Sequence, residues 1–206
     1  MVFYYQISDP DYIVYMGKDK YENEDLIKWG WPEDVWFHVD NLSSAHVYLR
    51  LKKGETMNDI PQRVMEECCQ LTKNNSIQGC KENNVSIIYT PWANLKKTRD
   101  MEPGQVMYHD ESQVKYVKNV KKVAIVINRL EKTKEWREVL LREERERRDK
   151  EERFTHRTAA AEVKKAELEA QNQKKQQAEI LHYTAVMKKE NMKSNKYNSV
   201  DDDDFM

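Results

Sequence analysis

The chain has 206 residues and a formal net charge of −1 at pH 7, with 34% charged and 39% hydrophobic residues. This length permits one domain or two small ones. The near-zero net charge argues against binding of polyanions over the whole surface, although it permits local basic patches. No apolar run approaches the roughly 20 residues that span a bilayer, and the start has no apolar signal-peptide segment. We therefore expect no intrinsic transmembrane span, so any membrane association would need a partner or a lipid.

The head of the chain begins with strand-like segments. Val2–Ile7 and Tyr12–Met16 are both rich in aromatic and β-branched residues, and the turn formers between them predict a pair of strands. A polar loop follows, in which Asn23 is a good N-cap for a short helix over Glu24–Lys28.

The next two strands are expected to form the centre of the sheet. Residues 34–39 alternate apolar side chains with Trp36 and His38, which is the period of a strand with both faces at least partly covered. A second strand follows over 46–51. The turn formers at 40–44 join the two as a hairpin.

The rest of the head contains a helix and further strands. Pro61 lies in the first turn of a predicted helix, and Val64, Cys68 and Leu71 give that helix one apolar face. Short strands are predicted at 85–90, 106–108 and 114–117.

The three cysteines give no recognisable framework. Cys68 and Cys69 are adjacent and Cys80 stands apart, which is a poor disulfide pattern and lacks the spacing of zinc ligands. A reducing compartment fits this usage best. We expect a cytoplasmic protein that holds no metal or cofactor.

The tail is predicted to be one long helix. Apolar residues recur at spacings of three and four from Val120 to Leu130, and every residue from Arg142 to Arg153 is charged. Pairs of opposite charge four residues apart stabilise such a helix by about 0.2–0.5 kcal/mol each. Because this charged segment has no apolar a and d positions, we expect an extended single helix with weak pairing at most.

These elements predict an α+β fold. The head is a small mixed β-sheet with two or three short helices, and a long charged C-terminal helix follows it. The expected divisions are a domain over 1–118, a coiled-coil-like helix over 119–190 and a disordered acidic tail over 191–206.

A set of short motifs is distributed over the head. They are Gly17, Asn23–Leu26, Asp34–Val39, Ser44–Val47, Ser76, Tyr89–Thr90, Lys96–Lys97 and Pro103–Val106. Together they resemble the NFACT-R domain family. With Asn128–Lys134 and the charged helix, the chain resembles the stand-alone branch of that family, the coiled-coil domain-containing protein 25 family. The chain departs from the wider family at Ser44–His46, where Gly-Ser-His is usual.

The resemblance implies a non-enzymatic module that binds nucleic acid, either DNA or RNA. It implies a link to the ribosome in the larger relatives, and DNA binding with cell-membrane association in the stand-alone branch, as for a sensor or adaptor. The regions with which the multidomain relatives sit on the ribosome and engage transfer RNA do not match this chain. Their peptide-tailing activity is therefore not carried over.

Two basic clusters lie beside aromatic residues, as a surface that binds phosphates and stacks bases requires. One is the loop after the second strand and the other follows Trp92. Acidic residues in the first cluster would repel phosphate unless they cap the following helix, and solvated loops at strand ends are the alternative interpretation. The candidate nucleic-acid-binding residues are Lys18, Lys20, Tyr21, Glu22, Asn23, Glu24, Asp25, Lys96, Lys97 and Arg99.

An enzymatic interpretation centres on two histidines. His38 and His46, on neighbouring strands near Asp34 or Asp40, have the side chains of a metal site or of a general acid and base. The sequence offers no convincing third ligand, phosphate-binding glycine loop or nucleophile motif. We favour histidines packed in the core beside the Trp36 ring, and no enzyme.

A third interpretation is a scaffold. In it the head docks on one partner and the long helix reaches a second protein, without nucleic acid. The long charged helix is the only direct argument for this scaffold role. Such helices are also compatible with solubility alone.

Overall fold

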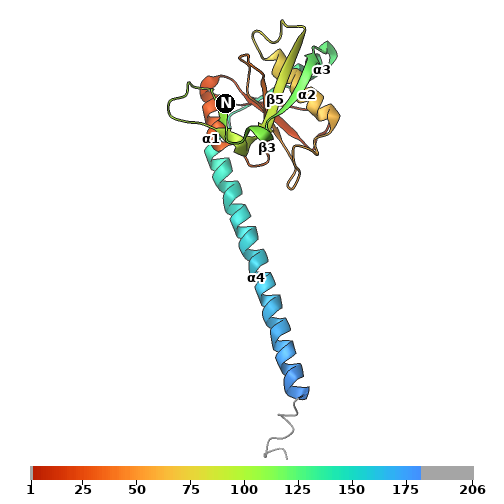
Figure 1. Ribbon diagram of the computed structural model, residues 1–206, viewed down its shortest axis with the longest axis vertical. Helices are drawn as coiled ribbons and strands as arrows, with labels where there is room; N and C mark the ends of the chain where they lie inside the picture. Colours follow the sequence, from red (N-terminus) through yellow and green to blue (C-terminus); the bar gives the residue numbers. More distant parts are fainter. Residues whose placement is uncertain (1, 182–206) are drawn as a thin grey trace, which may run out of the picture. The chain divides into compact units, whose positions relative to one another are not determined.

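The structure is a computed structural model that describes residues 2–181 (Figure 1). The predicted α+β class is confirmed, because a seven-stranded sheet with short helices precedes a long helix. The expected tail over 191–206 and the last part of the predicted helix lie outside the described residues. The helices are α1 (Lys20–Trp29), α2 (Gln62–Asn74), α3 (Ala124–Lys132) and α4 (Leu141–Leu181), with short 3-10 helices η1 (Trp92–Asn94) and η2 (Glu111–Gln113).

One sheet forms the centre of the head. Its strand order is β8-β5-β3-β4-β2-β1-β9, and its pairings are all antiparallel rather than mixed in direction. The strands that carry Trp36 and Val47 lie near its middle, as predicted. A separate ribbon pairs β6 with β7. The strands are β1 (Val2–Tyr5), β2 (Ile13–Gly17), β3 (Asp34–Val39), β4 (Val47–Arg50), β5 (Asn84–Pro91), β6 (Leu95–Lys96), β7 (Met107–Tyr108), β8 (Lys115–Lys121) and β9 (Glu135–Arg137).

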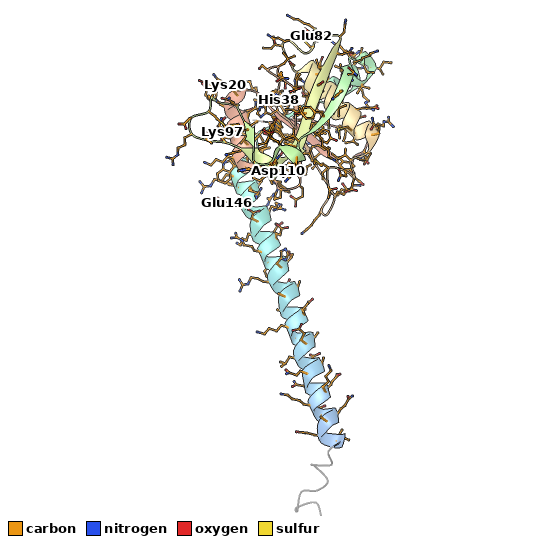
Figure 2. The ribbon with its side chains drawn as sticks, viewed as in Figure 1. Lys20, His38, Glu82, Lys97, Asp110 and Glu146 are labelled. Atoms are coloured by element: carbon orange, nitrogen blue, oxygen red, sulfur yellow. The ribbon has the colours of Figure 1, made fainter. Side chains whose placement is uncertain are left out.

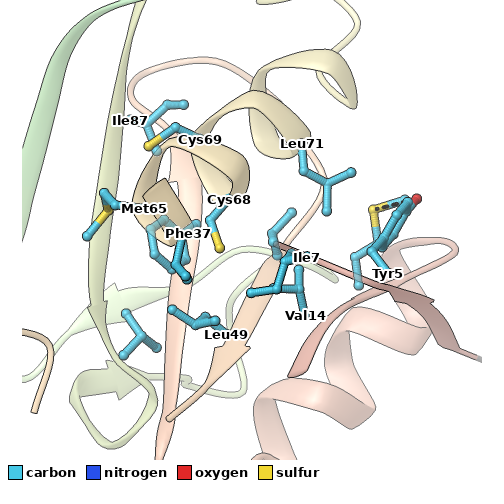
Figure 3. Close-up of a cluster of buried hydrophobic side chains, with 14 of the residues drawn as sticks. Tyr5, Ile7, Val14, Phe37, Leu49, Met65, Cys68, Cys69, Leu71 and Ile87 are labelled. Carbon is cyan, nitrogen blue, oxygen red and sulfur yellow. Dashed lines mark hydrogen bonds between the residues drawn. The ribbon is translucent and has the colours of Figure 1, made fainter. Parts of the chain in front are cut away.

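Alternate residues of the strands build two different faces. On the first face, Phe37 and Leu49 pack with Met65 and Cys68 of α2 (Figure 3). Phe37 and Cys68 are fully buried. Burial raises the pKa of the Cys68 thiol, so this cysteine serves as a small hydrophobe, as predicted.

The second face carries larger aromatic side chains and polar groups. Tyr15, Trp36 and Tyr48 are almost fully buried there and pack with Leu26 of α1 and Leu95 of β6. Helix α1 and the β6–β7 ribbon therefore cover this face. Strand β3 is covered on both faces, as its alternation predicted.

The region predicted as the start of the long helix forms separate elements. Helix α3 ends where the Thr133 hydroxyl donates to the Leu130 carbonyl at 2.8 Å and accepts from the Gln6 N–H at 3.2 Å. Such local side-chain bonds compete with the helix. Strand β9 then pairs with β1. The expectation of one unbroken helix over 119–190 is therefore wrong for the part before α4, because the free edge of β1 takes up the segment that follows α3.

Helix α4 crosses the boundary between two compact units. The first unit is Met1–Arg148, and the second begins at Asp149. Within the first unit, Arg148 forms an ion pair with Glu33. Within residues 2–181, no helix is both long and apolar enough to cross a membrane. The division of the chain into a domain over 1–118, a helical region over 119–190 and a tail over 191–206 stays a prediction.

Candidate nucleic-acid interface

The first basic cluster lies at the start of α1. The helix begins at Lys20, earlier than predicted, and its N-cap is Asp19 rather than Asn23. Asp19 Oδ1 accepts hydrogen bonds from the backbone N–H groups of Tyr21 (2.9 Å) and Glu22 (3.0 Å). These bonds lower the pKa of the Asp19 carboxyl. The segment predicted as a loop is thus the first turn of a capped helix.

Asn23 points into the head. Its side chain is 7% exposed and packs against Gly17, where an added Cβ would collide with the Asn23 Oδ1 atom. Only glycine allows this close approach. The exposed surface of α1 therefore does not include Asn23.

Glu24 links α1 to the loop that carries the second basic cluster. Its Oε1 atom accepts from the Lys97 ammonium at 2.7 Å and from the Gly104 N–H at 2.7 Å. Lys97 also donates to the carbonyls of Glu102 (2.7 Å) and Gln105 (2.9 Å). A lysine has three donors, so these three bonds occupy them all. In this conformation Lys97 holds the loop and has no N–H left for a phosphate.

The Glu24 link brings the two predicted clusters to one region of the head (Figure 2). A Cβ added at Gly104 would lie 3.6 Å from the Lys20 Cβ atom, so the loop contacts the first turn of α1. Gly104 has a φ of +83°, which favours glycine. The predicted site residues with exposed side chains are Lys18, Lys20, Tyr21, Asp25, Lys96 and Arg99.

Two of the three acidic residues of the first cluster are used within the protein. Glu22 accepts from the Lys18 N–H at 2.7 Å, and Glu24 holds Lys97. Asp25 is exposed. The repulsion expected from this acidic segment is therefore partly offset by internal hydrogen bonds.

Trp92 supports the fold instead of presenting a free ring. Its indole N–H donates to the carbonyls of Ile27 (2.9 Å) and Leu26 (3.3 Å) at the end of α1. An added Cβ at Gly30 would collide with the indole. The Arg145 guanidinium lies over the ring, 5.2 Å from its centroid. Sequence spacing placed Trp92 beside the second basic cluster, but tertiary contacts give it a different role.

His38 and His46 lie next to each other on the second face of the sheet. Their ring centroids are 5.3 Å apart, and the Trp36 ring stacks on His38 at 5.2 Å. Burial lowers the pKa of His46 to about 3 and also lowers that of His38. Both rings are therefore neutral at pH 7. Among residues 2–181, no group of three or more histidine, cysteine or acidic side chains has the arrangement of a metal site.

Asp34 serves a different network from the one considered in the sequence. Its carboxylate accepts from Tyr15 OH at 2.5 Å and from Arg50 Nε at 2.8 Å. The Arg50 guanidinium lies 3.7 Å from the Trp31 ring centroid. The register pairs Asp34 with Arg50 across neighbouring strands. No local pattern in the sequence predicts this network, because only strand register brings the residues together.

The head matches the family described as the NFACT protein RNA binding domain over residues 1–110. The coiled-coil domain-containing protein 25 homolog of Dictyostelium discoideum is 63% identical over 206 residues, which cover all of both chains. The Rqc2 homolog RqcH of Streptococcus pneumoniae is 28% identical over 121 residues, which are 58% of this chain and 21% of that protein.

A solved structure supports the same fold. The C-terminal part of the fibronectin/fibrinogen-binding protein from Streptococcus suis superposes with a TM-score of 0.52 at 20% identity, covering 64% of this chain and 48% of that one. At this identity the likeness shows the fold alone. The full-length similarity and the family match agree with the resemblance seen in the sequence. The chain belongs to the coiled-coil domain-containing protein 25 family, and its head is an NFACT-R domain.

Proposed function

We propose that the head is a non-enzymatic module that binds RNA through one surface, which we call the basic surface. It consists of the exposed side chains of Lys18, Lys20, Tyr21, Lys96 and Arg99. The observation that carries the proposal is the Glu24 link to Lys97 and Gly104, because it holds two separate basic segments together. The family's description as an RNA-binding domain supports the same class of ligand.

The chemistry of the basic surface suits an unpaired strand. Lysine and arginine contact phosphates, and an exposed aromatic ring stacks on a free base. Tyr21 is 66% exposed, and the Lys20 ammonium lies 5.3 Å from its ring centroid. Phosphate contacts carry no sequence information. We therefore expect binding to be largely indifferent to sequence. We also expect modest affinity, because few basic side chains are within reach of the strand.

DNA offers the same phosphates, so DNA binding is the second form of this proposal. RNA is favoured because the family is described as an RNA binding domain. Binding of matched RNA and DNA strands of equal length separates the two. Membrane association and a sensor role rest on the resemblance alone.

The test is a salt series with the full chain and a single-stranded RNA. Each lost phosphate contact reduces the slope of log affinity against log salt by about 0.7. Lys20→Ala, Lys96→Ala and Arg99→Ala should each lower the affinity and the slope. Lys81→Ala is the matched control, because Lys81 is an exposed lysine on the turn after α2. If Lys20→Ala, Lys96→Ala and Arg99→Ala all keep the parental affinity and slope, as the control should, RNA does not bind at the basic surface.

An adaptor role is the second candidate, and the length of α4 favours it. The helix spans 41 residues, and those from Phe154 to Ile180 are exposed. Such a helix presents charged side chains to a protein partner. Crosslinking in cells with and without nuclease distinguishes the roles, since capture of a protein that survives nuclease supports the adaptor.

A further inference from the structure

A pocket of about 560 Å³ opens on the second face of the sheet, beside the basic surface. Its walls come from strands β3, β5, β7 and β8, from His46 just before β4, and from the loop at 104–106. The side chains that matter for its chemistry are Trp36, His38, Asp40, His46, Tyr108 and Tyr116. This size lies within the range of small-molecule sites.

Aromatic rings dominate the pocket. Trp36 stacks on His38 with an interplanar angle of 8°, and its ring centroid lies 6.1 Å from that of Tyr108. Tyr116 is 52% exposed. The exposed Tyr116 ring offers a flat surface on which a planar heterocycle stacks.

The polar groups of the pocket are neutral donors and acceptors. His38 Nδ1 lies 2.8 Å from the Val39 carbonyl, so Nδ1 carries the proton and Nε2 is an acceptor in the neutral ring. His46 and Trp36 are 2% and 1% exposed, and within the described residues 2–181 neither His46 Nδ1 nor Trp36 Nε1 has a hydrogen-bond partner. Buried polar groups normally have partners, so these two atoms point to a ligand.

The charges of the pocket disfavour an anion. Among the residues that the structure describes, its lining contains the carboxylate of Asp40 and no lysine or arginine. Both histidines are neutral at pH 7, since burial lowers the pKa of each. A phosphate would meet no cation here, whereas an uncharged heterocycle would meet rings and hydrogen-bonding groups.

The pocket is continuous with the basic surface. Gly104 and Gln105 line it, and the same two residues are bonded to Glu24 and Lys97. Gly104 also lies against Lys20. A strand whose phosphates contact Lys20 therefore passes next to the pocket.

We infer that this pocket receives one unpaired nucleobase of a strand bound at the basic surface. The inference rests on the proposed function and adds its ligand class, a single-stranded or locally opened polynucleotide. The base stacks against Tyr116 and Tyr108 and its edge reaches His38, while Trp36 and His46, which are 1% and 2% exposed, form the floor of the pocket. Duplex cannot supply such a base without unpairing.

The test compares a short single-stranded RNA with an abasic version of equal length and charge, using the full chain. Stacking of one base corresponds to roughly a 5- to 150-fold difference in affinity. Tyr116→Ala, and Gln105→Trp to fill the pocket, should both reduce this preference for the base-containing strand. Because Tyr116 and Gln105 are exposed, neither change removes a core side chain. Phe154→Ala is the matched control for loss of an exposed ring, as Phe154 is 68% exposed on α4.

Two further measurements separate this inference from the proposed function. Tyr21→Ala removes stacking outside the pocket, and histidine side-chain NMR reports on His38 and His46 directly. Shifts of both histidine signals with the RNA, absent with the abasic strand, support the pocket. If the parent protein binds RNA with the expected salt slope, but Tyr116→Ala and Gln105→Trp keep the full preference and the histidine signals do not move, the pocket inference fails alone. If the parent protein binds neither strand, the proposed function has failed and the pocket inference with it.

Discussion

The two faces of the central sheet are built from the same strands and have different chemistry. The face under α2 is apolar, with Phe37, Val47 and Leu49 each 0% exposed. The opposite face buries Asp34 with Arg50 and stacks Trp36 on His38. Its neighbours are the basic surface and the pocket.

The comparison shows how one small domain builds an apolar layer and a polar layer from the same strands. Side chains on neighbouring positions of a strand point to opposite faces, so Phe37 and Trp36 belong to different layers although they are adjacent. The apolar face requires only side chains whose volume and shape fill the space under α2. The polar face keeps buried groups without partners, which is a cost in stability that a purely structural layer would avoid.

The largest expected effect tests the apolar face. Phe37→Ala should lower the free energy of unfolding by about 3–5 kcal/mol, because it leaves a cavity under α2. Urea unfolding followed by circular dichroism measures this. A loss below about 1 kcal/mol would show that the core is not centred on this ring.

The polar face should respond almost as strongly when its ion pair is broken. Asp34→Asn leaves the Arg50 guanidinium, whose side chain is 15% exposed, without its carboxylate. We expect a loss of about 3 kcal/mol in the free energy of unfolding. Replacing Asp11, whose ion pair with Lys52 is exposed, is the control and should cost less than about 1 kcal/mol. Equal losses for the two variants would contradict the structural role of Asp34.

The buried histidines should make stability depend on pH. The pKa of His46 is lowered to about 3 in the folded chain, while an unfolded histidine titrates near about 6.5. Below pH 6.5 the unfolded state therefore binds the proton first, and stability falls as pH falls toward 3. The slope reaches at most about 1.4 kcal/mol per pH unit for this group.

Thermal melting between pH 7 and pH 4 checks the histidine prediction. His46→Gln should flatten the profile, whereas His109→Gln, at an exposed loop position, should leave it unchanged. If His46→Gln and the parent protein show the same dependence of melting temperature on pH, His46 is not the cause of that dependence.

Lys96 and Lys97 are adjacent in the sequence, but we expect Lys97 to stabilise the fold and Lys96 to contact RNA. Lys97→Met should destabilise the chain by about 1 kcal/mol, because Glu24 and two loop carbonyls lose their donor. Lys96→Met should leave stability unchanged and reduce the salt slope of RNA binding. Melting measures stability and the salt series measures RNA binding. If Lys96→Met destabilises the chain and Lys97→Met reduces the salt slope, Lys96 holds the loop and Lys97 contacts RNA.

The smallest effects are expected in α4. Ion pairs such as Lys165 with Glu169, 4.0 Å apart, contribute about 0.2–0.5 kcal/mol each and are screened by salt. Circular dichroism should show helicity falling as salt rises, while the strands remain. Sedimentation that shows a tight dimer through α4 would replace the single-helix interpretation with a coiled coil.

Local sequence patterns were enough to predict much of the order of elements in the head. Alternation at 34–39 predicted a strand covered on both faces, and the spacing of Val64, Cys68 and Leu71 predicted the apolar face of α2. Periodicity reports which side of an element is buried, because the helix and strand repeats are fixed by backbone geometry. The sequence also predicted that His38 and His46 pack in the core beside the Trp36 ring.

Which side chains meet depends on tertiary contacts that no local pattern reveals. Lys97 and Lys96 look equivalent in the sequence, yet Lys97 binds Glu24, far away along the chain. The end of α3 and the pairing of β9 with β1 depend on Thr133 meeting Gln6. Strand register and loop closure set these contacts, and neither is encoded in a local pattern, since each depends on partners more than a hundred residues or several elements away.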